Sequence, residues 1–125
     1  MLHKEITEKI IGAAMTVHSA LGSGFQEIIY QRALEIELSL LRMKFEREKE
    51  MPIFYRGQQI GTRRVDFFVD DKIMVELKAI LALENVHLAQ ALNYLEAYNM
   101  DIGLLINFGA KSMEFKRVFN KKALQ

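Results

Sequence analysis

Three charged residues in the middle of the chain, Asp66, Glu76 and Lys78, have types and spacing that could support metal-dependent hydrolysis. A close pair of carboxylates suits a hard divalent cation, which takes oxygen ligands. A lysine beside that pair can orient or deprotonate a water, or stabilise charge that develops on a phosphate. An Asp followed by Glu-x-Lys also occurs by chance on solvated strand faces, so the chemistry depends on the fold bringing the three side chains together.

The segment RRVDFFVDDKIMVELKAI, residues 63–80, predicts two strands joined at Asp70–Asp71. With Val69 opposite Ile73, one face of this hairpin is wholly apolar, and a slip of one residue would mix both faces. The expected apolar face comprises Val65, Phe67, Val69, Ile73, Val75 and Leu77, and the other face comprises Asp66, Phe68, Met74, Glu76 and Lys78. This register requires an odd number of loop residues or a bulge. It places Asp66 across from Glu76 with Cβ atoms ~5 Å apart, a repulsive pair unless something neutralises it.

A third acid lies in the stretch GFQEIIY, where Gly24, Glu27 and Tyr30 recur every three residues. On a helix this spacing places the three within about a third of the circumference. One interpretation of Glu27 is a helix start, since acids are favoured in the first turns. The other is that Glu27 belongs to a site whose remaining members lie further along the chain.

Two helices are expected before the strands that carry the acids. Apolar residues recur at helical spacing from Lys4 to Ala20, and Gly22 is a natural C-cap. Ser23 and Gln26 have the spacing of a capping box, which predicts a second helix that starts at Gly24 and runs to about residue 43.

The remaining pattern predicts further strands and one more helix. Strands are expected at residues 45–55, from residue 60, at residues 102–108 and at residues 112–119, and a helix is expected at residues 85–98 with Asn85 as N-cap. Three polar residues, His87, Gln90 and Tyr94, form one stripe on that helix, a pattern that surface residues also show. The predicted fold class is α/β, a mixed sheet with helices packed against it.

Composition narrows the class of protein. With 125 residues and one proline the chain is expected to form a single domain, residues 1–125. The absence of cysteine excludes thiol catalysis and zinc–thiolate sites. No signal peptide and no membrane-spanning run is recognised, so a cytoplasmic protein without membrane contacts is expected. A net charge of +1 neither requires nor excludes nucleic-acid binding.

Together these motifs resemble the PD-(D/E)XK nuclease superfamily and, within it, the small proteins named after the motif GxxExxY. The naming motif corresponds to Gly24, Glu27 and Tyr30, and the nuclease signature to Asp66 and VELKA, residues 75–79. HLAQALNY, residues 87–94, resembles the HxxQ segment, and LLINFG, residues 104–109, resembles the late buried strand. The position before Asp66 is Val65 instead of proline.

The resemblance implies a restriction-endonuclease-like αβββαβ core and a set of site residues. Asp66, Glu76 and the Leu77 backbone carbonyl would bind Mg²⁺ or Mn²⁺, with Glu27 as a further metal or water ligand. Lys78 would act on the attacking water. Gln90 would hold Lys78 or the phosphate, and Tyr94 would pack beneath the site or bond to the backbone. The supporting residues would be Tyr30, which would brace the helix or the site, Gly24, which would allow the backbone to approach the sheet or the substrate, and His87, as a donor, ligand or plain hydrogen-bonding residue.

The expected function is metal-dependent hydrolysis of nucleic-acid phosphodiester bonds. The alternative is a catalytically inert nuclease-like fold that binds nucleic acid or protein, and a weaker one is a structural subunit with a solvated acidic face. Nucleic acid is the expected partner, DNA ahead of RNA, and a homodimer is compatible with a domain this small. Arginines at positions 56, 63 and 64 and basic residues from Lys111 to Lys122 could neutralise phosphates or could simply solubilise loops and the tail.

Overall fold

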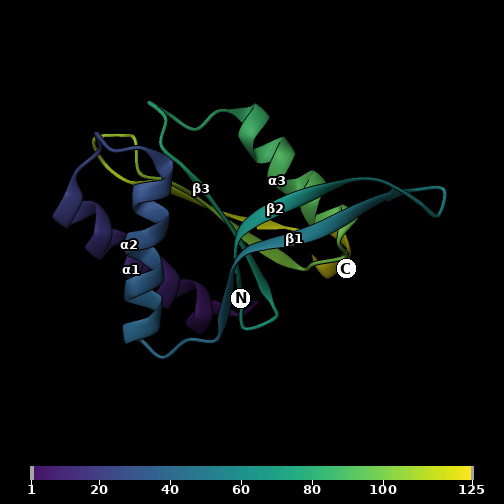
Figure 1. Ribbon diagram of the computed structural model, residues 1–125, viewed down its shortest axis with the longest axis horizontal. Coiled ribbons are helices and arrows are strands. Elements are labelled where there is room, and N and C mark those ends of the chain that lie inside the picture. The colour runs from purple at the N-terminus through teal and green to yellow at the C-terminus, as the bar shows by residue number, and fades with distance from the viewer. Residues whose placement is uncertain (1, 125) are drawn as a thin grey trace.

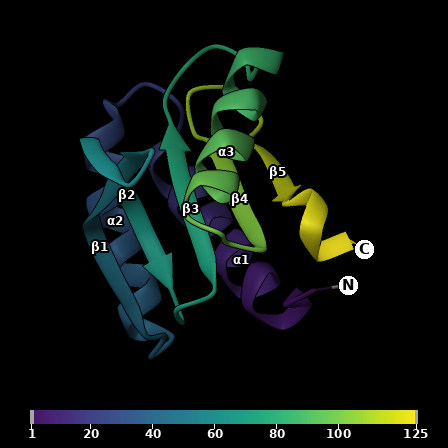
Figure 2. The same cartoon turned by 90° about the vertical axis from the view of Figure 1, so that its right-hand side faces the viewer.

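A mixed five-stranded sheet forms the centre of the protein, and helices cover both of its faces (Figures 1 and 2). The structure is a computed structural model that describes residues 2–124. Its elements are α1 (Lys4–Leu21), α2 (Glu27–Leu40), β1 (Phe45–Tyr55), β2 (Gln58–Val69), β3 (Ile73–Lys78), α3 (Asn85–Ala97), β4 (Ile102–Asn107), β5 (Glu114–Phe119) and a 3-10 turn η1 (Lys121–Leu124). The strand order is β1-β2-β3-β4-β5, and only β3 and β4 run parallel. The predicted α/β class is confirmed.

Two apolar layers hold the sheet between the helices. On one side α1 and α2 pack on alternate residues of the central strands, among them Phe67, Val75, Leu77 and Leu104. On the other side α3 packs on a smaller cluster around Met74. Strand β4 is buried along its whole length, as its almost wholly apolar sequence predicts. No helix in the described part of the chain is long and apolar enough to cross a bilayer.

The β2–β3 hairpin has the register that burial favours. Val69 pairs with Ile73 and Phe67 pairs with Val75. Strand β2 ends at Val69 and β3 begins at Ile73, so the loop holds three residues, the odd number that this register requires. Asp70 and Asp71 both have positive φ there, 54° and 55°. The predicted register is therefore confirmed.

The face predicted for Val65 is wrong. Val65 packs in the α3 cluster, whereas Phe67 packs with α1 and α2 on the opposite face. Between them the β1–β2 ladder is interrupted, because Arg47 pairs with Phe67 and the next pair is Lys49 with Val65. Glu48, at the gap, has a φ of 53°. The register is the same on both sides of this gap, so no extra residue is inserted, but side chains no longer alternate regularly across it and the outer part of the ribbon turns a different face toward α3.

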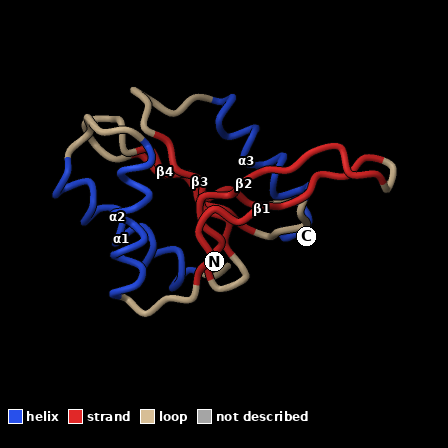
Figure 3. The backbone as a smooth tube through the Cα atoms, viewed as in Figure 1, coloured by secondary structure: helices blue, strands red, loops and turns tan. Residues whose placement is uncertain are grey.

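Beyond this interruption, β1 and β2 continue as a two-stranded arm that projects from the body of the protein (Figures 1 and 3). We call residues 52–62 the arm. A second irregularity lies between Ile53 and Phe54. A turn closes the arm at Arg56 and Gly57, which both have positive φ, 49° and 77°, and glycine adopts such a φ without steric cost.

Helix α2 begins three residues later than its capping pattern predicts. The N-cap is Gln26 and makes no side-chain capping bond, so the expected start at Gly24 with a Ser23 cap is wrong. The Tyr30 hydroxyl instead donates to the carbonyl of Gly22 (2.5 Å) and accepts from the amide of Phe25 (3.1 Å). Because these bonds occupy the backbone of residues 22–25, that segment forms a loop.

The N-cap of α3 is also different from the predicted one. Asn85 is the first helical residue, and Glu84 is the N-cap. His87 supplies the reciprocal contact, since its Nδ1 accepts from the amide of Glu84 at 2.9 Å. A histidine therefore takes the place that Glu or Gln usually has in a capping box.

Candidate active site

Asp66 lies where the pairing of β2 with β3 ends. The ladder extends to Phe67 and Val75, and one step beyond it the amide of Leu77 donates to Asp66 Oδ2 at 2.7 Å. Asp66 Oδ1 accepts from Gln31 Nε2 of α2 at 2.9 Å. The Leu77 side chain is fully buried in the core. Asp66 is thus oriented by one backbone donor from β3 and one side-chain donor from α2.

Glu76 is a buried carboxyl group next to Asp66. Only 5% of the residue is exposed, and its Oε2 accepts from Arg63 Nη2 at 3.0 Å. Its Oε1 is buried and has no hydrogen-bond partner among the described residues. Burial, and after it the negative charge of Asp66, raises the pKa of Glu76 to about 8 against the opposing charge of Arg63. Part of this rise is the repulsion that a charged Glu76 would meet from Asp66, as the sequence predicts.

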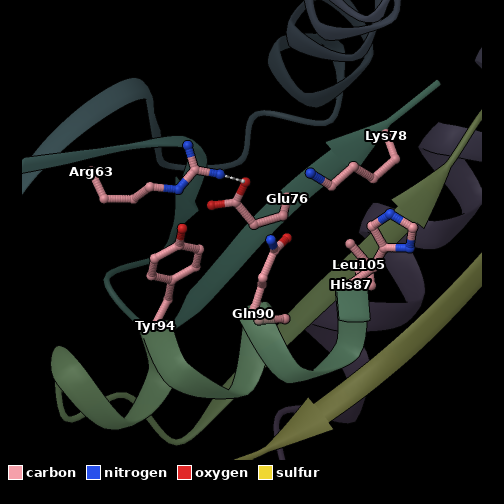
Figure 4. A pocket seen from close by; sticks show the side chains of 8 residues that line it. Arg63, Glu76, Lys78, His87, Gln90, Tyr94 and Leu105 are labelled. Atoms are coloured by element: carbon pink, nitrogen blue, oxygen red, sulfur yellow. Dashed lines mark hydrogen bonds and ion pairs between the residues drawn. The ribbon is translucent and has the colours of Figure 1, made fainter. Parts of the chain in front are cut away.

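A small pocket opens between Glu76 and α3 (Figure 4). Its volume is about 10 Å³, roughly the space of one water molecule. Lys78 lines it from β3, with its ammonium group on the Glu76 side, and Gln90 points across from α3 toward both (Figure 4). His87 and Tyr94 complete the helix stripe on the same wall. The structure thus brings the predicted helix stripe to the predicted strand acid and lysine.

His87 and Tyr94 both have structural contacts in addition to their place in the pocket. Because His87 Nδ1 accepts the Glu84 amide, its other ring nitrogen carries the proton and is the one able to donate. The Tyr94 ring lies under the guanidinium of Arg63, 4.8 Å from its central carbon. Arg63 is therefore held between Glu76 and an aromatic face.

Glu27, the first residue of α2, lies within electrostatic reach of the pocket. Burial raises its pKa first, the charge of Asp66 raises it further, and Lys78 and Arg63 lower it. Tyr30, one turn later, is fully buried and stacks on Phe108 with ring centroids 4.7 Å apart. Through its bonds to the preceding loop, Tyr30 determines where α2 begins, as a brace for this helix would.

Gly24 does not make the close approach to the sheet that the sequence predicts. A Cβ built on Gly24 would meet no atom within 4 Å, and its φ is not positive. Gly24 lies in the loop before α2, so it does not share a helix face with Glu27 and Tyr30. Nothing in the fold itself requires glycine at this position.

Two residues in contact with the acids had not been predicted as site members. Gln31 is buried, follows Glu27 by one helical turn and connects Asp66 to Arg47, whose Nη1 donates to its amide oxygen at 2.8 Å. Gln31 follows Glu27 by four residues, a spacing that places both side chains on the same face of a helix and would have predicted Gln31 near the site. The sequence predicts Arg63 only as a member of a basic cluster with Arg56 and Arg64. With regular alternation it would share the face of Phe67, and the interruption at Glu48 turns it toward Glu76.

The donor set suits a hard divalent cation, although no three His, Cys, Asp or Glu side chains in the described part of the chain are already grouped as metal ligands. Among the residues that the structure describes, Glu76 Oε1 is buried without a hydrogen-bond partner and each Asp66 oxygen accepts one hydrogen bond, which leaves it a further lone pair. Glu27 adds a third carboxylate close enough to affect the same charges. Oxygen donors with excess negative charge are the chemistry that Mg²⁺ or Mn²⁺ requires.

Comparison with known proteins agrees with this geometry. A family model described as the PD-(D/E)XK nuclease superfamily matches residues 4–118. The crystal structure of SSO0001 has a similar fold, with a TM-score of 0.57 and 20% sequence identity over 94% of this chain. The chain spans 59% of the length of that structure. A search of curated proteins found no match.

Proposed function

This chain belongs to the PD-(D/E)XK nuclease superfamily, and from that premise we propose that it hydrolyses phosphodiester bonds in nucleic acids with Mg²⁺ or Mn²⁺ as cofactor. The superfamily match establishes a nuclease-like fold. The observation that supports catalysis is Glu76, a buried carboxylate with an unpartnered oxygen, beside Asp66 and in one pocket with Lys78. A buried repulsive acid pair costs stability, so its presence is more easily explained by a bound cation than by folding.

In this proposal Asp66, Glu76 and the Leu77 carbonyl hold the metal, with Glu27 as an additional metal or water ligand. When bound, the metal supplies Lewis acidity at a phosphoryl oxygen and lowers the pKa of a coordinated water. The chain supplies orientation. Gln31 and the Leu77 amide hold the Asp66 carboxylate in position, since outer hydrogen bonds orient first ligands.

The remaining site residues act on the water and the phosphate. Lys78 positions the attacking water or accepts its proton, and its positive charge stabilises the phosphorane-like transition state. Gln90, which points toward Lys78, holds the lysine or the phosphate. Tyr94 keeps Arg63 in place by stacking, and His87 offers its second ring nitrogen as a donor at the rim. Tyr30 acts indirectly, through the start of α2.

We further propose that the chain is one of the small GxxExxY proteins, on the basis of Gly24, Glu27 and Tyr30. Residues 1–125 would act as a single nuclease domain in the cytoplasm. DNA is the preferred substrate class ahead of RNA, and a homodimer would enlarge the surface offered to a long substrate. Since Gly24 has open space around it, its place in the motif fits an approach by substrate better than one by the sheet.

Cleavage of labelled DNA and RNA, single- and double-stranded, with Mg²⁺, Mn²⁺ or EDTA, tests the proposal. We expect metal-dependent cleavage that falls by at least ~100-fold in Lys78→Ala, the scale of losing an acid–base or electrostatic group. Lys72→Ala is the matched control, because Lys72 is an exposed lysine in the loop before the same strand. Binding without any cleavage would replace the proposal with the inert binding module, and equal losses in both variants would remove Lys78 from the mechanism.

A further inference from the structure

The arm, residues 52–62, is an exposed surface that the proposed chemistry does not use. Every residue from Phe54 to Thr62 is exposed. Two aromatic side chains and one aliphatic side chain near its tip face solvent: Phe54 is 59% exposed, Tyr55 64% and Ile60 67%. Scattered exposed apolar residues are ordinary, but three of them at the tip of one projecting ribbon indicate a binding surface.

The charge of the arm indicates what it binds. The arm contains Arg56 and no acidic residue, and Arg63 and Arg64 follow directly after it on β2. Arg56 lies in the turn at the tip, and Arg64 makes only an exposed 3.6 Å pair with Glu50, which is worth little in water. The same charge on a second copy would oppose edge-to-edge pairing of two arms. Guanidinium groups interleaved with aromatic rings are the chemistry that binds phosphates and unpaired bases together.

The arm is also continuous with the candidate active site. Arg63 contacts Glu76 in the pocket, and the next residues toward the tip on the same strand belong to the arm. Tyr98, the C-cap of α3, donates to the carbonyl of Met51 at 3.1 Å, which connects the base of the arm to the helix that lines the pocket. From Arg63 to Gln58 the strand covers roughly 17 Å, about five nucleotides at the stacked spacing.

We propose that the arm binds a single-stranded segment of the nucleic-acid substrate that leaves the active site, with Arg56 and Arg64 on phosphates and Phe54 and Tyr55 stacked on bases. This inference rests on the proposed nuclease function. Base faces are free only where strands are unpaired, since in a duplex they are covered by neighbouring pairs and must be unstacked before a side chain can enter. A single strand therefore suits the exposed rings better than a duplex does.

Fluorescence anisotropy with a labelled 15-nucleotide single-stranded DNA, the same sequence as RNA and as DNA duplex, tests the arm separately from catalysis. The protein carries Lys78→Ala throughout and the buffer contains EDTA, so neither cleavage nor metal enters the result. We expect Phe54→Ser with Tyr55→Ser to weaken single-strand binding at least ~10-fold with an unchanged salt slope. Arg56→Ala with Arg64→Ala should weaken binding and reduce the salt slope by about 1.4, or 0.7 per phosphate contact.

Matched controls lie on other surfaces. Ile36→Ser with Leu40→Ser removes exposed apolar residues of α2, and Lys4→Ala with Lys9→Ala removes two exposed charges of α1. Losses equal to those of the arm variants would overturn the proposal. So would no binding by the parent protein, or tighter binding of duplex that the aromatic substitutions leave unchanged.

Sedimentation of all variants completes the test. A dimeric parent that the aromatic substitutions convert to monomer would assign the arm to self-association and overturn the proposal. If the arm proposal fails while the Lys78-dependent cleavage described above is observed, the nuclease function stands. If cleavage is absent but the arm still binds single strands, the arm proposal survives as the binding surface of an inert module.

Discussion

At the scale of single residues, Glu76 is buried and lies next to both an acid, Asp66, and an arginine, Arg63. The pKa of Glu76, about 8, lies above its ordinary value of 4.5 because burial and Asp66 disfavour the charged form. In the unfolded chain the group ionises near its ordinary pKa. Between these two pKa values the unfolded chain is ionised at Glu76 while the folded protein keeps the proton. In this pH range the proton that folding must take up lowers the stability as the pH rises.

We predict that the metal-free protein loses stability as pH rises from about 5 to about 8. Below the pKa that Glu76 has in the unfolded chain, both states are protonated and the stability is highest. The free energy of unfolding then falls until the pH reaches the pKa of Glu76 in the folded protein. Glu76→Gln keeps the shape and removes the titration, so its free energy of unfolding should change less over this range. Urea unfolding in EDTA measures this, with the exposed Glu8→Gln as control. Parallel curves for Glu76→Gln and the parent would contradict the raised pKa.

Gln31 provides a second test at this scale, because it orients Asp66 without being a ligand. We predict that Gln31→Ala weakens Mn²⁺ binding by about 10-fold or more, the usual effect of losing a hydrogen bond to a metal ligand. Calorimetric titration well below the melting temperature measures this. Glu35→Ala is the control, since Glu35 contacts Arg47 from the same helix and not Asp66. Equal Mn²⁺ affinity in Gln31→Ala and the parent would show that the ion does not use Asp66.

At the scale of elements, the loop after β4 determines the path of the chain beyond Lys78. The amides of Ile80 and Gly109 both donate to Asn107 Oδ1 at 3.0 Å, so the two segments lie against each other. A Cβ on Gly109 would lie 2.3 Å from the Ile80 nitrogen, with no flexible side chain to yield. The fold therefore requires glycine at position 109, whereas a Cβ at Gly24 would meet no atom within 4 Å.

We predict that Gly109→Ala lowers the free energy of unfolding by about 3 kcal/mol, the upper end of the cost of overpacking, because backbone must move. Gly24→Ala should change it by no more than about 0.5 kcal/mol. Denaturant unfolding of the two variants measures the difference. If Gly24→Ala is stable but loses cleavage, the glycine serves the substrate. A large loss of stability in Gly24→Ala would mean that the loop before α2 is packed more tightly than its open surroundings indicate.

At the scale of the whole molecule, the site lies between the packed core under α1 and α2 and the smaller apolar layer under α3. Helices α1 and α2 cover the larger apolar layer, and α3 covers a smaller one that leaves room for the pocket. The acids lie where β2, β3 and α2 meet, so a cation there would join three elements. Metal binding and global stability should therefore be linked.

We predict that Mn²⁺ raises the melting temperature of the protein by several degrees, because an ion that binds only the folded state adds RT ln(1 + [L]/Kd), or about 2.7 kcal/mol at 100 times Kd. Glu76→Gln should lose most of this response while starting from an equal or higher melting temperature without metal. Differential scanning calorimetry with Mn²⁺ and then with EDTA measures both effects. The same Mn²⁺ shift in Glu76→Gln and the parent would place the ion elsewhere.

The strand register and the acid–lysine motif could be predicted from the sequence, because both follow from local periodicity and burial. Only one pairing of residues 65–69 with 73–77 separates apolar from charged side chains for most of its length, and the fold adopts it. Helix α1 and strand β1 follow their patterns for the same reason. Helical spacing predicts that His87, Gln90 and Tyr94 lie on one face of α3. In the structure that face lies across the pocket from Glu76 and Lys78 of β3.

The additional residues that reach the acids could not be predicted from local patterns, because long-range packing places them there. Arg63 faces Glu76 because the β1–β2 ladder is interrupted at Glu48, and no local period of residues 63–69 contains that information. Gln31 reaches Asp66 only through the packing of α2 on the sheet. The start of α2 is decided by Tyr30, whose burial fixes its hydroxyl against the preceding loop. Each depends on contacts between distant segments, which packing selects over local preference.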